Sequence, residues 1–110
     1  MHWFGRLRRA GEIAFVRRRG RQAALATLSA YAAPQAGPPS RVGVTVSKAV
    51  GGAVVRNLVR RRIRGALAEL PPPSAPLRLL FVAKPAAATV PYGELAADVA
   101  AAVARVAVRP

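Results

Sequence analysis

Residues 41–70 are the stretch that most constrains how this chain can fold. The first part alternates valines with small or polar residues, which is the pattern of a strand with one apolar face. These valines are Val42, Val44 and Val46. Gly51 and Gly52 then interrupt the pattern, and the apolar spacing changes to that of a helix. The stretch therefore predicts a strand over Arg41–Lys48, a glycine turn and a helix from Ala53.

The helix predicted after this turn has one apolar and one basic face. At about 100° per residue, five of its apolar side chains form a single stripe. The stripe contains Val55, Val59, Ile63, Ala66 and Leu70. The opposite face carries Asn57, Arg60, Arg61 and Arg64. Arg56, Arg60 and Arg64 also follow one another at four-residue spacing, where each like-charged pair costs about 0.2–0.5 kcal/mol in an isolated helix. A row that opposes helix stability indicates a surface for an anionic ligand. The helix should end before Pro71.

The positive charge of the chain is concentrated in its first part. The net charge is +14, and residues 1–64 contain fourteen of the eighteen lysines and arginines with Glu12 as their one acid. This distribution predicts a polyanionic partner. The chain has no cysteine, which excludes disulfides and thiolate metal sites. We see neither a signal peptide nor an apolar run of the roughly 18 residues that a membrane span needs, so we expect a cytoplasmic protein with no membrane partner.

The remaining segments predict an α+β fold in one domain over residues 1–110. Residues 1–9 are expected to be flexible. The other predicted elements are a helix over Ala10–Arg19, a strand over Ala24–Ala33, a strand over Leu77–Lys84 and a helix from Pro91 or Tyr92 to Val108. A short extra strand after Gly20 is left open. The order indicates a sheet with helices packed on it.

The acidic residues and the histidine do not form a recognisable catalytic group. A metal-dependent nuclease needs clustered carboxylates, whereas the four acids are scattered over three predicted helices. Glu94 and Asp98 are one turn apart, and we expect them on a solvated face. The one histidine, His2, lies near the start of the chain, although general acid–base cleavage commonly uses histidine. We therefore expect no catalytic residue and no direct metal ligand in this protein.

The basic composition and the lack of a recognisable catalytic group favour nucleic-acid binding as the function class. A second basic cluster contains Arg17, Arg18, Arg19 and Arg21. Tyr31 either stacks on an unpaired base or belongs to the core of a thin sheet. Lys48 and the backbone amides near Gly51 and Gly52 either bind a phosphate at a helix N-terminus or form a simple turn.

From Arg41 to Arg64 the chain reads R-V-G-V-T-V-S-K-x-x-G-x-A-V-x-R-N-x-x-R-R-x-x-R. This run resembles the signature of the bacterial ribonuclease P protein subunit, which pairs with a catalytic RNA to remove the 5′ leader of precursor tRNA. The resemblance implies an α/β sandwich with a small, mostly antiparallel four-stranded sheet, three helices and a left-handed β-α-β crossover. It also implies ribonuclease P RNA and precursor tRNA as partners, one protein per RNA, and Mg²⁺ bound through the RNA.

The resemblance also implies two sets of RNA-binding residues. The set facing the catalytic RNA is Lys48, Arg56, Asn57, Arg60, Arg61 and Arg64. The set lining a cleft for the leader, between the N-terminal helix and the sheet, is Ile13, Phe15, Val16, Arg17, Tyr31, Val44 or Thr45, and Lys84.

Four positions depart from the pattern of the family. Leu58 takes the third place of its usual Arg-Asn-Arg motif, and Ala49 replaces a second lysine after Ser47. Ile13 and Arg17 stand where phenylalanine is common, which predicts weaker stacking on the leader and stronger charge attraction.

Two alternative functions stay open. One is a ribosomal or ribosome-assembly protein of similar fold, and the other, ranked last, is a membrane-surface protein.

Overall fold

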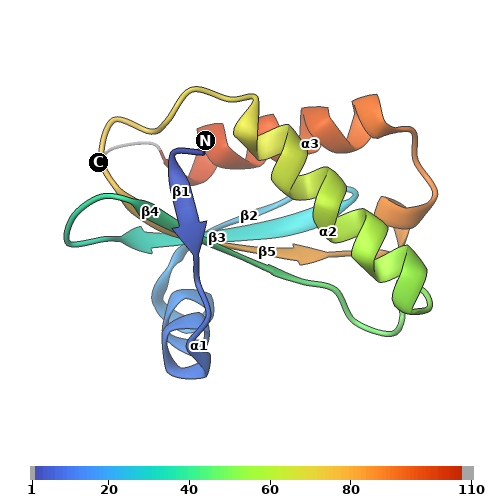
Figure 1. Cartoon of the computed structure of the whole chain (residues 1–110), viewed down its shortest axis with the longest axis horizontal. Helices are drawn as coiled ribbons and strands as arrows, with labels where there is room; N and C mark the ends of the chain where they lie inside the picture. Colours follow the sequence, from blue (N-terminus) through green and yellow to red (C-terminus); the bar gives the residue numbers. More distant parts are fainter. Residues whose placement is uncertain (1, 108–110) are drawn as a thin grey trace.

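A mixed five-stranded sheet lies between α1 on one face and α2 and α3 on the other (Figure 1). The structure is a computed structural model and describes residues 2–107. The strands are β1 (Phe4–Arg6), β2 (Arg21–Ala24), β3 (Leu28–Pro34), β4 (Ser40–Thr45) and β5 (Leu77–Ala83). The helices are α1 (Ala10–Arg19), α2 (Ala53–Ala68) and α3 (Tyr92–Val106), with a 3₁₀ turn over Pro85–Ala88.

The strand order is β1-β4-β5-β3-β2. β3 is antiparallel to β2 and β5, whereas β4 is parallel to β5 and β1. The expectation of four mostly antiparallel strands is therefore corrected to five strands, with as many parallel as antiparallel pairings among the described residues. β4 and β5 are neighbours joined through α2, which gives the β-α-β crossover of the fold. The short strand left open after Gly20 is present as β2, and β3 begins at Leu28, not at Ala24.

The N-terminal segment is held to the sheet, contrary to the expectation of a flexible stretch over residues 1–9. Phe4–Arg6 pair with β4, and the amide of Leu7 extends this pairing by donating to the carbonyl of Val42 at 3.0 Å. Leu7 is buried, and the indole Nε1 of Trp3 donates to the carbonyl of Leu70 at 3.1 Å. Trp3 and Leu7 therefore anchor the segment.

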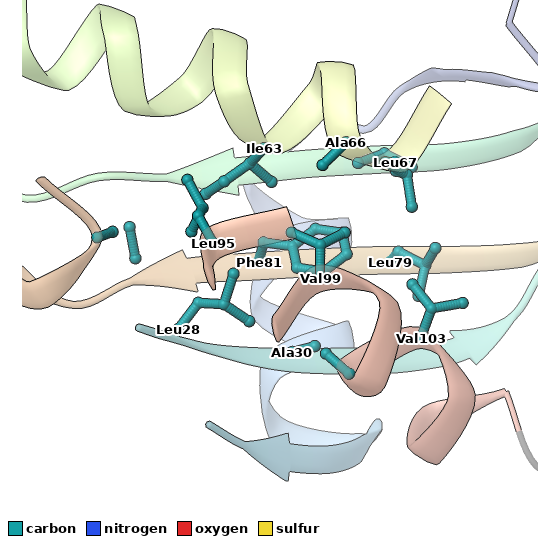
Figure 2. Packing of buried hydrophobic residues seen from close by; sticks show 14 of the residues in the cluster. Leu28, Ala30, Ile63, Ala66, Leu67, Leu79, Phe81, Leu95, Val99 and Val103 are labelled. Atoms are coloured by element: carbon teal, nitrogen blue, oxygen red, sulfur yellow. The ribbon is translucent and has the colours of Figure 1, made fainter. Parts of the chain in front are cut away.

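The main core lies between the sheet and the pair α2 and α3 (Figure 2). Phe81 of β5 is fully buried among residues of both helices, including Ile63 and Val99. The valine face predicted for β4 is confirmed, with Val42 and Val46 buried and Val44 partly buried against the same core. On α2 the buried residues are Val59, Ile63, Ala66 and Leu67, whereas Val55 is 37% exposed and Leu70 follows the end of the helix.

A smaller core lies under α1 on the other face of the sheet. Val16 is fully buried there against Ala33 and Leu80. Gly20 follows α1 directly, and a Cβ at this position would collide with the carbonyl oxygens of Val16 and Ala32. Glycine therefore allows the end of α1 to lie against β3.

Asp98 corrects the expectation of a solvated acidic pair on α3. Its Oδ2 accepts hydrogen bonds from the backbone amide of Thr27 at 3.1 Å and from the Thr27 hydroxyl at 2.7 Å. Glu94 is exposed as expected. Asp98 thus joins α3 to the turn between β2 and β3. Val108, the predicted end of the last helix, lies outside the described residues.

Within residues 2–107, no helix combines the length and apolar character that a membrane crossing requires.

Candidate nucleic-acid interface

The exposed side of α2 carries the predicted basic surface. Asn57 and Arg61 are exposed, and Arg56, Arg60 and Arg64 are half-buried along one flank. Nη1 of Arg60 donates to Oδ1 of Asn57 at 2.9 Å, so these two predicted residues act as one polar group. Their helix is fixed through its buried face, which makes the arginines a surface on a rigid support.

The arginines of α2 repel one another and a further arginine from β1. Partial burial lowers the pKa of Arg64 from its ordinary value, and the charges of Arg6 and Arg60 lower it further. An anion bound here would oppose the repulsion, because an opposite charge favours the ionised guanidinium. Arg6 therefore belongs to the α2 surface. Sequence reasoning missed it, because nothing in residues 1–9 shows that they pair with β4.

Arg56 is held at the edge of this surface in an unusual way. Its Nε is buried and has no hydrogen-bond partner among the described residues. A buried donor without a partner typically costs about 1–3 kcal/mol. The α2 surface thus contains a second feature that opposes the stability of the free protein.

The turn before α2 has the geometry of an open helix N-terminus. Gly51 has a φ of +157°, and a Cβ there would lie 2.9 Å from a methyl carbon of Val55, so the position requires glycine. Gly52 caps α2 with no side-chain hydrogen bond, which leaves the first amides of the helix without a capping side chain. Lys48 is exposed in the same turn. Amides and a lysine in this arrangement suit an anion.

The face of the sheet beside α1 brings several of the predicted cleft residues together. The guanidinium carbon of Arg17 lies 5.7 Å from the ring centroid of Tyr31, and Gln22 Nε2 donates to the Tyr31 hydroxyl at 3.3 Å. Ile13 and Tyr31 are both half-buried beside Val82. Thr45 is exposed and is the direct β4 partner of Val82. Sequence reasoning did not select Val82, because the apolar run of β5 gives no sign of which residues face α1.

Four residues named for the cleft, including the alternative Val44, have other positions. Val16 is fully buried under α1, so its side chain is not accessible to a ligand. Phe15 lies on the opposite flank of α1 from Arg17 and packs against Arg78, with 4.9 Å between the guanidinium carbon and the ring centroid. Lys84 Nζ donates to the carbonyl of Leu25 at 2.6 Å and so holds the turn between β2 and β3. Val44 packs on the main core, which leaves Thr45 as the β4 residue on the α1 side.

The carboxylates are dispersed. Within residues 2–107, no three His, Cys, Asp or Glu side chains lie close enough together to hold a metal ion. Glu69 accepts a hydrogen bond from the Tyr92 hydroxyl at 3.4 Å, and Asp98 is bound to Thr27. The side chains of residues 2–107 therefore do not form a donor set that fits a metal ion.

Comparison with known proteins shows which family the chain resembles. The family model for ribonuclease P matches residues 1–107. The ribonuclease P protein component of Streptomyces bikiniensis is 41% identical over 91% of this chain and 89% of its own length. That of Beutenbergia cavernae is 46% identical over 86% of this chain and 81% of its own length.

Solved structures show the same fold. The RNase P protein of Staphylococcus aureus superposes with a TM-score of 0.81 at 20% identity, over 92% of this chain and 95% of that protein. The RNase P protein of Thermotoga maritima gives a TM-score of 0.78 at 14% identity, over 96% and 98% of the two chains. The sequence matches and the fold agree, and the chain belongs to the ribonuclease P protein family.

Proposed function

We propose that this chain binds the catalytic RNA of ribonuclease P through α2 and the turn before it, as one protein per RNA in the cytoplasm. The residues that carry this contact are Lys48, Arg56, Asn57, Arg60, Arg61 and Arg64, together with Arg6. The repulsion between Arg64, Arg6 and Arg60 supports the proposal, because a polyanion offsets it. The uncapped N-terminus of α2 adds amide donors for a phosphate.

The single-stranded 5′ leader of precursor tRNA binds, in this proposal, on the sheet face beside α1. The observation that carries it is the guanidinium of Arg17 over the ring of Tyr31, next to the exposed Thr45. An aromatic ring flanked by positive charge is how unpaired bases are commonly held. This face lies across the sheet from α2, so one protein can contact both RNAs at once.

The protein positions RNA and leaves the cleavage to the catalytic RNA in this proposal. The carboxylates of the chain are dispersed, and Asp98 and Glu69 are hydrogen-bonded elsewhere. The required Mg²⁺ is then held by the RNA. The chain contributes by lowering the repulsion between the two RNAs near the scissile bond.

Cleavage of a leader-bearing precursor tRNA at low Mg²⁺ tests the proposal. Adding the protein to its correctly folded cognate RNA should raise the cleavage rate. This increase in cleavage rate should be larger for a precursor with a long single-stranded leader than for one with a leader of one nucleotide. The Arg17→Gln protein should give a smaller increase than wild type on the long-leader precursor and the same increase on the short-leader precursor.

A matched substitution controls for the charge removed. Arg105→Gln on α3 takes away the same charge from an exposed position outside both surfaces, and it should leave both increases in cleavage rate unchanged. No stimulation of cleavage by the wild-type protein would refute the proposal. A ribosomal protein would instead sediment with ribosomal subunits and leave tRNA processing unaffected.

A further inference from the structure

The flank of α1 that faces away from Tyr31 carries a second surface suited to nucleic acid. Phe15 is 40% exposed at a concavity of about 580 Å³ that Arg19, Arg21 and Arg78 also line. None of the described residues that line this concavity is acidic. Phe15 thus shares an open concavity with three arginines, of which Arg78 contacts its ring.

Arg78 gives the Phe15 surface a fixed geometry. Its Nε donates to the carbonyl of Pro34 at 3.0 Å, and its guanidinium carbon lies 4.9 Å from the ring centroid of Phe15. Arg78 is also the direct β5 partner of Arg41 on β4. Paired residues on neighbouring strands point to the same face, so Arg41 continues the basic surface across the sheet.

Arg41 also lines a second concavity, of about 670 Å³, at the start of α1. Its basic lining residues are Arg6, Arg8, Arg9 and Arg41, with Gln35 and a single acid, Glu12. Arg9 is the N-cap residue of α1 and makes no side-chain cap. Positive charge at a helix N-terminus opposes the helix dipole. Four arginines gathered at this position are therefore unfavourable in the free protein and favourable with an anion bound.

The two flanks of α1 are separate surfaces. Val16, between Phe15 and Arg17 in sequence, is fully buried against the sheet. Phe15 therefore projects to one side of the helix, with Arg78, and Arg17 projects to the other, with Tyr31. A ligand on one flank does not occupy the other.

We propose that the Phe15 flank of α1 binds an unpaired RNA strand, with one base stacked on Phe15 and neighbouring phosphates held by Arg41, Arg78 and the arginine concavity. An aromatic platform beside a positively charged groove is the recurrent design for single-stranded nucleic acid. A paired base cannot use the ring, because its faces are stacked within the duplex. The identification of the strand as RNA rests on the proposed function, but the flank is distinct from the leader surface at Tyr31.

Tryptophan fluorescence of the full-length protein tests stacking at this position directly. Phe15→Trp adds one fluorophore to the single Trp3 of the chain. Octa-adenylate should quench the added fluorescence, and an abasic ribose-phosphate oligomer of equal length should not. Tyr92→Trp is the matched control, because Tyr92 is 38% exposed on α3 and lies on the other face of the sheet. Octa-adenylate should leave its added fluorescence unchanged.

Affinity measurements with conservative variants complete the test. Phe15→Tyr keeps an aromatic face and should retain the affinity for octa-adenylate. Phe15→Leu keeps apolar bulk without a π-face and should lose roughly five- to hundredfold at this flank, the range expected for one stacked base. Circular dichroism should show the same helix content for both variants.

Three results would overturn the proposal. One is equal quenching of the tryptophans at positions 15 and 92, and another is equal affinity of Phe15→Leu and Phe15→Tyr. The third is displacement of octa-adenylate by octa-glutamate more readily than by the abasic oligomer, which would indicate an acidic protein segment as the occupant. If quenching at position 15 occurs while cleavage is not stimulated, the proposed function fails and this site stands. If the protein stimulates cleavage but octa-adenylate does not quench the fluorescence at position 15, the proposed function stands and this site fails.

Discussion

Asp98 shows at the scale of one residue how little of the charge on this chain is used for stability. Most charged side chains of this chain are arginines, whereas the carboxylate of Asp98 accepts two hydrogen bonds from Thr27, which is 2% exposed. Hydrogen bonds to a charged acceptor are stronger than those between neutral groups. This carboxylate therefore joins α3 to the β2–β3 turn, whose other end is held by Lys84.

Replacing Asp98 by alanine should lower the free energy of unfolding by about 1–3 kcal/mol, because the buried amide of Thr27 loses its acceptor. The melting temperature should fall by about 4 °C or more for each kcal/mol. Thermal unfolding followed by circular dichroism measures both. Glu94→Ala removes the same charge from an exposed position of α3, so it controls for the change in net charge. Equal losses in the two variants would show that the hydrogen bonds to Thr27 contribute nothing.

Three consecutive residues of α1 show why the candidate site could be predicted only in part. The sequence placed Phe15, Val16 and Arg17 together in a leader cleft. In the structure they have three different surroundings, because successive residues of a helix point about 100° apart. Which of them faces the sheet depends on the rotation of α1 about its axis. That rotation is fixed by the contacts of Val16 with Ala33 and Leu80, and the cleft residues that the family resemblance implied were carried over by position without taking it into account.

At the scale of elements, α2 balances packing on one side against repulsion on the other. Val59, Ile63 and Leu67 bury the inner face, whereas Arg56, Arg60 and Arg64 follow one another at four-residue spacing along a flank. Each like-charged pair opposes helix formation by about 0.2–0.5 kcal/mol. The packing against β5 and α3 outweighs this cost, and the helix can therefore carry a surface whose charges suit RNA.

Arg64→Gln should change the RNA affinity of α2 without lowering the stability of the free protein. It should lower the slope of log affinity against log salt by about 0.7 for a single-stranded RNA contact and about 0.9 for a duplex contact, because one phosphate contact is lost. The stability of the free protein at low salt should stay the same or rise slightly, since the repulsion with Arg6 and Arg60 is removed. Binding titrations at several salt concentrations and denaturant unfolding measure the two effects.

Arg105→Gln provides the comparison for α2. Arg105 is an exposed arginine in the last turn of α3, where a positive charge favours the helix dipole. Its replacement should leave the salt dependence of RNA binding unchanged. If both variants changed the salt dependence equally, the binding would follow net charge, and α2 would have no special role.

The elements themselves differ in how far the sequence could predict them. β4, the glycine turn and α2 were predicted closely, because alternation, a glycine pair and helical spacing follow one another within thirty residues. β1 was missed because the three residues Phe4–Arg6 are too few to show an alternating pattern, and their strand depends on pairing with Ser40–Val42. The parallel pairing of β4 with β5 is likewise set by the path of α2 across the sheet, which no local pattern records.

For the whole molecule, the charge is distributed over both faces of the sheet. Residues 1–64 supply α1, most of α2 and four of the five strands, and they carry all but four of the lysines and arginines of the chain. The basic surfaces of α2, the Tyr31 face and the Phe15 flank thus lie around the two cores on the two faces of the sheet. Each of them disfavours the folded state through repulsion and favours it once an anion is bound.

We therefore expect anions to stabilise the fold. In low salt the helical circular dichroism of the free protein should be reduced, and millimolar sulfate should restore it. An anion at one hundred times its dissociation constant adds about 2.7 kcal/mol to the stability of the state that binds it.

The concavity lined by Arg6, Arg8, Arg9 and Arg41 is the site where we expect sulfate to act most strongly. Chloride at the same ionic strength separates general screening from binding, because it screens the charges without bridging guanidinium groups. Arg41→Gln should shift the sulfate midpoint to higher concentration. A protein that is fully helical in low salt, or that responds equally to chloride and sulfate, would contradict this view, since its own core would then suffice to hold its positive charge together.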